Sequence, residues 1–253
     1  MTEPTFSPGM PMWLDLASTD LQSSKNFYGQ LFNWEFEDLG PEAGGYNFAR
    51  IGGKMVCGLG PAQDPSRGSS WAVVFDVDNA DETVSKAQAA GAKVLAPPMD
   101  VMGSGRMAVL ADPAGAAFTV WQPMAHTGAE IIHEHGTFTW AELSTTDIGA
   151  TKTFYPKIFP VAMNDYDLGD SATYTVFHVA GKDVAGAMAN PSVPPNWGVY
   201  FEVNDTDAIA DQAIDLGANE LMRDDTPPGR IAMLIDPQGA PFAILQSNPD
   251  FQM

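Results

Sequence analysis

The spacing of apolar residues along the first sixty positions predicts one strand, one helix and three further strands. Residues 11–18 carry apolar side chains and end at Ser-Thr-Asp, which is typical of a β-strand and its stop. Thr19 or Asp20 can cap a helix that runs to about Phe32, because the apolar residues after it form one stripe: Leu21, Phe27, Leu31 and Phe32. Three short strands separated by glycine-rich turns follow at 34–38, 46–51 and 54–60.

The same order of elements recurs in the next sixty residues. A strand is predicted at 71–77, and Asn79 with Glu82 three residues later resembles a capping box. The helix that begins there ends at Gly91, because glycine is the usual residue just beyond a helix. Three strands complete the unit at 93–96, 106–111 and 116–122, and an Asp-Pro-x-Gly turn joins the last two.

This pair of units returns in the second half of the chain. Residues 13–16, Trp-Leu-Asp-Leu, return 127 positions later as Trp-Ala-Glu-Leu at 140–143. The motif Gly-Lys-x-Val-x-Gly at 53–58 returns at an offset of 128, and the Asp-Pro-x-Gly turn that begins at Asp112 returns at Asp236. The offset drifts by only four residues over many matches, so the chain consists of two copies of one domain.

The repeat sets the expected domain boundaries. We expect the first domain at residues 1–125 and the second at 126–253, with a linker near 124–134. One local conflict lies in the third helix, where Pro156 removes a main-chain hydrogen bond. We therefore expect that helix to kink or to end early.

Composition narrows the range of partners. The 253 residues have a formal net charge of −20 and only 12 Lys and Arg, so the surface repels phosphate backbones and anionic lipids. No apolar run approaches the roughly 18 residues that span a bilayer, and the single Cys57 excludes an intramolecular disulfide. The first residues have neither a basic nor an apolar stretch, so we expect no cleaved signal. We expect a cytoplasmic monomer that binds a small molecule, without nucleic acid or membrane as a partner.

The motifs resemble those of the vicinal oxygen chelate superfamily, which includes glyoxalases, bleomycin-resistance proteins and dioxygenases. The resemblance rests on βαβββ modules used twice per domain, on Phe-Tyr-x-x-Leu-Phe-x-Trp at 27–34 and on the Asp-Pro-x-Gly turns. It covers nearly the whole chain and is strongest to the two-domain glyoxalase-like proteins of actinobacteria. The resemblance implies an α+β fold with tandem domains, in which four βαβββ modules form two cupped mixed sheets with helices on the convex side.

The same resemblance implies where a metal would bind. The superfamily holds a divalent metal with His or Gln on a first strand and Glu on a last strand of a module. The six matching positions in this chain carry Trp13, Ala72, Thr119, Trp140, Gly198 and Ala243. None of these is an ordinary metal ligand, so we expect neither a metal nor another cofactor, although a divalent metal on other residues stays possible.

The histidines leave alternatives open. The run from His133 to His135 can put two imidazoles on one side of an extended segment, which is a weak metal pattern, or it is simply a solvated part of the linker. His178 either faces the second cavity or is a hydrogen-bonded structural residue. Arg106 and Arg230 recur in both halves after a glycine and either bind an anion or form salt bridges.

Strand alternation predicts what lines the two concave faces, because residues two apart point to the same side. If the tryptophans stand at the ligand positions, a carboxylate points inward beside each of them. The first cavity is then lined by Trp13, Asp15, Met107, Val109, Thr119 and Trp121. The second is lined by Trp140, Glu142, His178, Tyr200, Ile231 and Met233.

These residues support more than one function. A carboxylate beside an indole fits a ligand that has a flat ring and a donor or a positive charge. A partly desolvated Asp15 or Glu142 with a raised pKa would also suit a general base, which would make the protein a metal-free enzyme. The remaining alternatives are a metal-dependent lyase, isomerase or dioxygenase with unusual ligands such as His178 and Glu142, or tryptophans that merely fill a core beside rim charges. We favour binding of a small aromatic or apolar molecule in metal-free cavities.

Overall fold

Each half of the chain forms one mixed sheet of eight strands in the computed structural model, which describes residues 3–169 and 172–251. The strand order is β2-β3-β4-β1-β5-β8-β7-β6 in the first sheet and β10-β11-β12-β9-β13-β16-β15-β14 in the second. The first half contains β1 (Pro11–Ser18), α1 (Leu21–Phe32), β2 (Glu35–Asp38), β3 (Asn47–Ile51), β4 (Lys54–Pro61), β5 (Ser70–Asp76), α2 (Ala80–Ala89), β6 (Lys93–Val101), β7 (Gly105–Ala111) and β8 (Ala117–Pro123).

The second half repeats this order. It contains β9 (Phe138–Thr145), α3 (Ile148–Ile158), β10 (Ala162–Gly169), β11 (Ala172–Val179), β12 (Lys182–Ala189), β13 (Asn196–Glu202), α4 (Thr206–Asp215), β14 (Asn219–Thr226), β15 (Gly229–Ile235) and β16 (Pro241–Ser247). The expected α+β fold with four βαβββ modules is confirmed. The division at residue 125 stays a prediction, because the linker packs against both halves.

The helices begin where their capping residues place them. The side chain of Asp20 accepts a hydrogen bond from the Ser23 amide at the start of α1, and Asp147 does the same for Ala150 in α3. The helix α3 ends one residue earlier than the repeat predicts from α1, with Pro156 in its last turn. The helix runs through Pro156 to Ile158, so the expected early end amounts to a single residue. No helix in the described part of the chain is long and apolar enough to cross a membrane.

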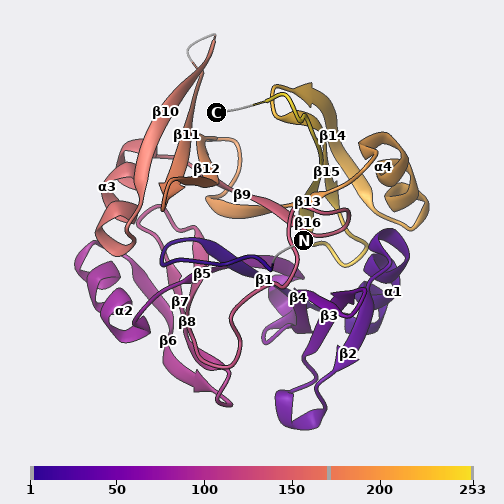
Figure 1. Cartoon of the computed structure of the whole chain (residues 1–253), viewed down its shortest axis with the longest axis horizontal. Coiled ribbons are helices and arrows are strands. Elements are labelled where there is room, and N and C mark those ends of the chain that lie inside the picture. Colours follow the sequence, from indigo (N-terminus) through magenta and orange to yellow (C-terminus); the bar gives the residue numbers. More distant parts are fainter. Residues whose placement is uncertain (1–2, 170–171, 252–253) are drawn as a thin grey trace.

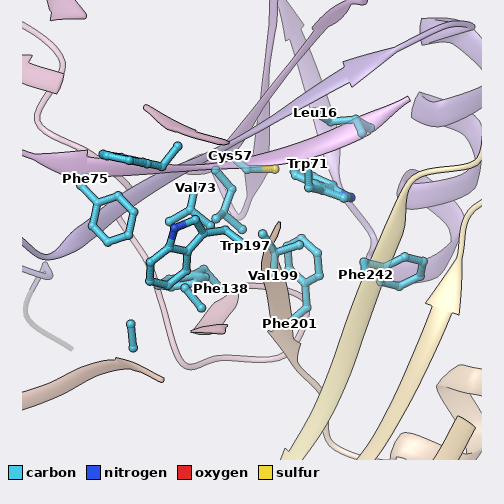
Figure 2. Packing of buried hydrophobic residues seen from close by; sticks show 14 of the residues in the cluster. Leu16, Cys57, Trp71, Val73, Phe75, Phe138, Trp197, Val199, Phe201 and Phe242 are labelled. Carbon is cyan, nitrogen blue, oxygen red and sulfur yellow. The ribbon is translucent and has the colours of Figure 1, made fainter. Parts of the chain in front are cut away.

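The convex faces of the two sheets pack against each other, so that the concave faces point away from each other (Figure 1). The helices lie at the two flanks of this interface, α1 beside α4 and α2 beside α3. Aromatic rings fill the space between β5 and β13 (Figure 2). Phe75 stacks on Phe159 at 5.2 Å, and Trp71 meets the edge of Phe201 at 5.2 Å. The two halves therefore share one hydrophobic core.

Two buried hydrogen-bonded chains cross this interface in opposite directions. In one, the indole N–H of Trp71 donates to the Tyr28 hydroxyl at 3.0 Å, and Tyr28 donates to Asp236 of the other half at 3.0 Å. In the other, Trp197 donates to Tyr155 at 3.0 Å, and Tyr155 donates to Asp112 at 3.2 Å. The Tyr of each Phe-Tyr motif thus joins the Asp-Pro-x-Gly turn of the opposite half.

Candidate functional site

The first concave face, which we call the first cup, has a carboxylate on its floor. Asp15 lies on β1, and the hydroxyl of Tyr46, just before β3, donates a short hydrogen bond to it. The indole N–H of Trp13 lies 3.0 Å from the Tyr46 hydroxyl and 3.2 Å from Asp15. Burial raises the pKa of Asp15, although the hydrogen bonds from Tyr46 and Trp13 oppose that shift.

The second concave face, the second cup, repeats this arrangement and adds one donor. The indole N–H of Trp140 donates to the Tyr174 hydroxyl at 2.8 Å, and Tyr174 donates to Glu142 at 2.9 Å. The hydroxyl of Tyr200 donates to the other oxygen of Glu142 at 3.2 Å. Burial raises the pKa of Glu142 against these two bonds. Since Val74 occupies the position of Tyr200 in the first half, only Glu142 is held by two hydroxyls.

A glycine makes room for the tyrosine in each cup. Gly58 pairs with Asp15 in the parallel ladder of β1 and β4, and Gly186 pairs with Glu142 in that of β9 and β12. A Cβ atom at Gly58 would lie 1.7 Å from the Tyr46 hydroxyl oxygen, and one at Gly186 would lie 1.9 Å from that of Tyr174. The repeated Gly-Lys-x-Val-x-Gly motif therefore ends at a position where any side chain would displace the tyrosine.

The two cups differ in how open they are. The linker between β8 and β9 runs across the first cup (Figure 1), where Trp13 is only 4% exposed. In the second cup Trp140, Glu142 and Tyr174 stay partly exposed. A cavity of about 390 Å³ borders Trp140, with walls from Phe6, the linker and β12. Asp15 and Tyr46 are partly exposed as well, so the cups differ chiefly in their indoles: Trp13 is enclosed, whereas Trp140 is partly exposed and borders the cavity.

Comparisons with known proteins identify the family of this chain. Residues 12–120 match the family model of the Glyoxalase/Bleomycin resistance protein/Dioxygenase superfamily. The chain is 40% identical to the anthracycline biosynthesis protein DnrV of Streptomyces peucetius, over 95% of this chain and 94% of that protein. The chain belongs to this superfamily. It is also 34% identical to the putative glyoxylase CFP32 of Mycobacterium tuberculosis, over 96% of this chain and 97% of that protein.

A solved structure of the superfamily shows the same fold at low identity. The 2,2',3-trihydroxybiphenyl 1,2-dioxygenase of Sphingomonas wittichii superposes with a TM-score of 0.65 and 14% identity, over 96% of this chain and 93% of that chain. At this identity the likeness concerns the fold alone. The chemistry of this superfamily member therefore has to come from its own side chains.

The residues at the superfamily's metal positions do not fit a divalent metal. On the first sheet Trp13 and Thr119 both pair with Val74, which brings an indole and a hydroxyl together. On the second sheet Trp140 and Ala243 both pair with Tyr200, which brings together an indole, a methyl group and a phenol. Among the described residues no three His, Cys, Asp or Glu side chains gather closely enough to hold a metal ion. No catalytic step through a metal can be derived from these residues.

The predicted lining residues lie on the concave faces as strand alternation requires. In the first cup Trp13, Trp121 and Met107 pack in one cluster, and Val109 pairs with Thr119 on neighbouring strands. In the second cup the clustered residues are Trp140, Tyr200, Ile231 and Met233. That any of these residues contacts a ligand stays a prediction.

The remaining predicted residues have structural partners. His178 forms a close pair with Asp183 across β11 and β12 through Nδ1, while its buried Nε2 has no hydrogen-bond partner among the described residues. His133 and His135 bind different groups, Thr139 and the Asn204 amide, and a positive φ of 59° at His133 turns the segment. Their imidazoles are therefore not arranged as paired ligands.

The two repeated arginines form salt bridges, and the thiol is enclosed. Arg106 bonds to Asp81 and Asp100, and Arg230 bonds to Asp207. Cys57 is fully buried, and burial raises the pKa of its thiol well above the usual range, which disfavours a reactive thiolate.

Sequence reasoning missed three residues of the cups. Tyr46 returns as Tyr174 at the offset of 128 that also relates the glycine motifs, so the repeat itself carried a signal for this pair. His126 also enters the first cup from the linker, where its ring lies 4.4 Å from that of Trp13. No periodic pattern marks His126, because the path of a linker is set by the sheets that it crosses.

Proposed function

We propose that the second cup binds a small, flat aromatic molecule without a metal. The observation that carries this proposal is the Glu142 carboxylate, held by the hydroxyls of Tyr174 and Tyr200 beside the partly exposed indole of Trp140. A fixed carboxylate orients a hydroxyl or amino group on the ligand, while the indole supplies an apolar face for the ring. In the first cup the corresponding indole, Trp13, is buried beneath the linker and offers no such exposed face.

The apolar surface around the carboxylate supports an aromatic ligand. Tyr200 forms one buried cluster with Ile231, Ala243 and Leu245. Met233 packs against this cluster, and its polarizable sulfur suits contact with a ring. The similarity to DnrV supports the same class of ligand, since that relative is named for anthracycline biosynthesis and anthracyclines are flat polycyclic molecules. Glu142 then acts as a hydrogen-bond acceptor for the ligand.

Tryptophan fluorescence tests this proposal. A dihydroxyanthraquinone, which is flat and carries hydroxyl donors, should quench the fluorescence in a saturable way. Glu142→Gln should weaken its binding by roughly ten- to a hundredfold, because a hydrogen bond to a charged group contributes about 1.5–3 kcal/mol. Glu42→Gln, at an exposed glutamate in the loop before β3, is the charge-matched control and should bind like the unaltered protein. If Asp15→Asn weakens binding and Glu142→Gln does not, the ligand occupies the first cup and the proposal is wrong.

Metal content tests the second half of the proposal. Protein purified without an affinity tag is analysed by mass spectrometry before and after dialysis against a chelator and after reloading with divalent metals. We expect the anthraquinone affinity to be the same in all three preparations. A stoichiometric metal whose removal abolishes binding would show that the site depends on ligands outside the superfamily positions.

A further inference from the structure

The linker is fixed across the first cup by main-chain hydrogen bonds on both sides. The amides of Met124 and His126 donate to the Ser104 carbonyl at 3.1 and 2.9 Å. Farther along, the Ala129 amide donates to Met12 on β1 and the Glu130 amide to Met55 on β4, both at 2.9 Å. These contacts hold the linker against β1, β4 and the β6–β7 turn, and they place the side chain of His126 inside the cup.

Three aromatic rings surround the imidazole of His126. Its ring lies 4.4 Å from Trp13 and 5.6 Å from Trp121, nearly perpendicular to both, and it stacks on Phe48 at 5.7 Å. The indole N–H of Trp121 donates to the His126 carbonyl at 3.0 Å, which fixes the main chain beside the ring. The imidazole therefore occupies a box shaped for one flat ring.

The two nitrogens of this imidazole make no hydrogen bond that would hold the ring in the box. Both ring nitrogens are buried, and neither has a hydrogen-bond partner among the residues that the structure describes. Burial lowers the pKa of His126 to about 4, so the ring is neutral near pH 7. What the box holds is a neutral ring in edge and face contact with three others, which is how a small aromatic ligand would be held.

The second cup lacks this box. By the repeat, Val176 stands in place of Phe48 and Leu245 in place of Trp121, so two of the three rings are missing. After β16 the chain is bonded to the β14–β15 turn, where the Asn248 amide donates to Pro228 at 2.8 Å. The box and the ring that fills it belong to the first cup.

We propose that the first cup is a latent binding site for a single neutral aromatic ring, and that His126 of the chain's own linker fills it as a tethered ligand. The ligand class is a five- or six-membered ring such as an imidazole or a phenol, since Trp13, Phe48 and Trp121 leave room for one ring between them. In the unaltered protein the tethered ring outcompetes a free one, because the tether gives it a high effective concentration. The inference concerns a different cup from the proposed anthraquinone site and does not depend on it.

Removal of the tethered ring tests this inference. His126→Ala should lower the melting temperature (Tm) by more than about 6 °C, since it empties the box. Imidazole, added at about pH 8 to keep the free ring largely uncharged, should restore at least about half of that loss in a saturable way. The unaltered protein and His135→Ala, a variant of the other side of the linker, should show no such rise. A His126→Ala protein whose Tm does not respond to imidazole would overturn the inference.

A second variant keeps the test informative if His126→Ala does not fold. His126→Phe keeps a ring in the box and removes the two unpartnered nitrogens, so its Tm should lie within about 2 °C of the unaltered value or above it. Its anthraquinone affinity in the second cup should not change. If His126→Phe is as destabilised as an aliphatic His126→Leu variant, the box does not select for a flat ring and the inference is wrong.

Discussion

The hydroxyl of Tyr28 should carry a large share of the stability of the contact between the two halves. The substitution Tyr28→Phe removes one oxygen atom, which both accepts from Trp71 and donates to Asp236 at 3.0 Å. The ring stays in place, so no large cavity forms and the effect is electrostatic. Because the residue lies in the shared core, the loss should appear in the unfolding of the whole chain.

The magnitude follows from the two bonds. Loss of a hydrogen bond to a buried carboxylate costs about 1.5–3 kcal/mol, and a stranded indole N–H costs about 1–3 kcal/mol more. Asp236 keeps the amides of Gln238 and Ala240 as donors, so the carboxylate is not left without partners. We expect a loss of about 3 kcal/mol in the free energy of unfolding, and Tyr155→Phe should cost a similar amount through Trp197 and Asp112.

Urea unfolding followed by circular dichroism measures this loss. Tyr28→Phe should shift the midpoint to lower urea without changing the slope, since the surface exposed on unfolding is the same. Tyr166→Phe on the edge strand β10 is the control and should change the stability by less than about 0.5 kcal/mol. If Tyr28→Phe is as stable as this control, the hydroxyl chain does not stabilise the interface and the reasoning is refuted.

Three further predictions concern the cups. The pKa of His126, about 4, lies below the ordinary value, so between pH 7 and 5.5 only the unfolded chain takes up a proton at this residue. The free energy of unfolding should therefore fall by about 1 kcal/mol more in the unaltered protein than in His126→Phe over this range. Equal pH profiles of the two proteins in urea unfolding would contradict this. Gly186→Ala should abolish anthraquinone quenching, because its Cβ displaces Tyr174, whereas Gly198→Ala, whose Cβ meets nothing closer than 3.6 Å, should weaken it only mildly. The pKa of Glu142 is raised, so anthraquinone affinity should fall as the pH drops, beginning above the usual titration range of glutamate; a flat profile down to about pH 4 would exclude an ionised acceptor.

The sequence predicted the fold well because the periodicities are local and the repeat presents each of them twice. The largest error in the first half lies in β6, which is expected at 93–96 and continues through Pro97 and Pro98 to Val101. The strand is at the edge of its sheet, where prolines are tolerated, and its register shifts between Ala96 and Met99. The end of β6 thus depends on its place at the edge of the sheet, which a local sequence pattern does not contain.

The candidate sites were predictable only in part for the same reason. Strand alternation placed Asp15 and Glu142 on the concave faces, since parity is fixed by the strand itself. The hydrogen bonds from Tyr28 to Asp236 and the place of His126 depend on how two sheets and a linker lie in space. Such contacts join residues far apart in sequence whose spacing carries no period.

The single linker has a consequence for how the two halves can change over time. In a symmetric homodimer any substitution alters both copies of a cup at once, so a gain in one site is tied to the same change in the other. Here both copies lie in one chain and can differ: Phe48 and Trp121 contact the linker's His126 in one half, whereas their counterparts in the other half are Val176 and Leu245. Substitutions in one copy can therefore improve the packing of the linker, while substitutions in the other copy change which ligand binds.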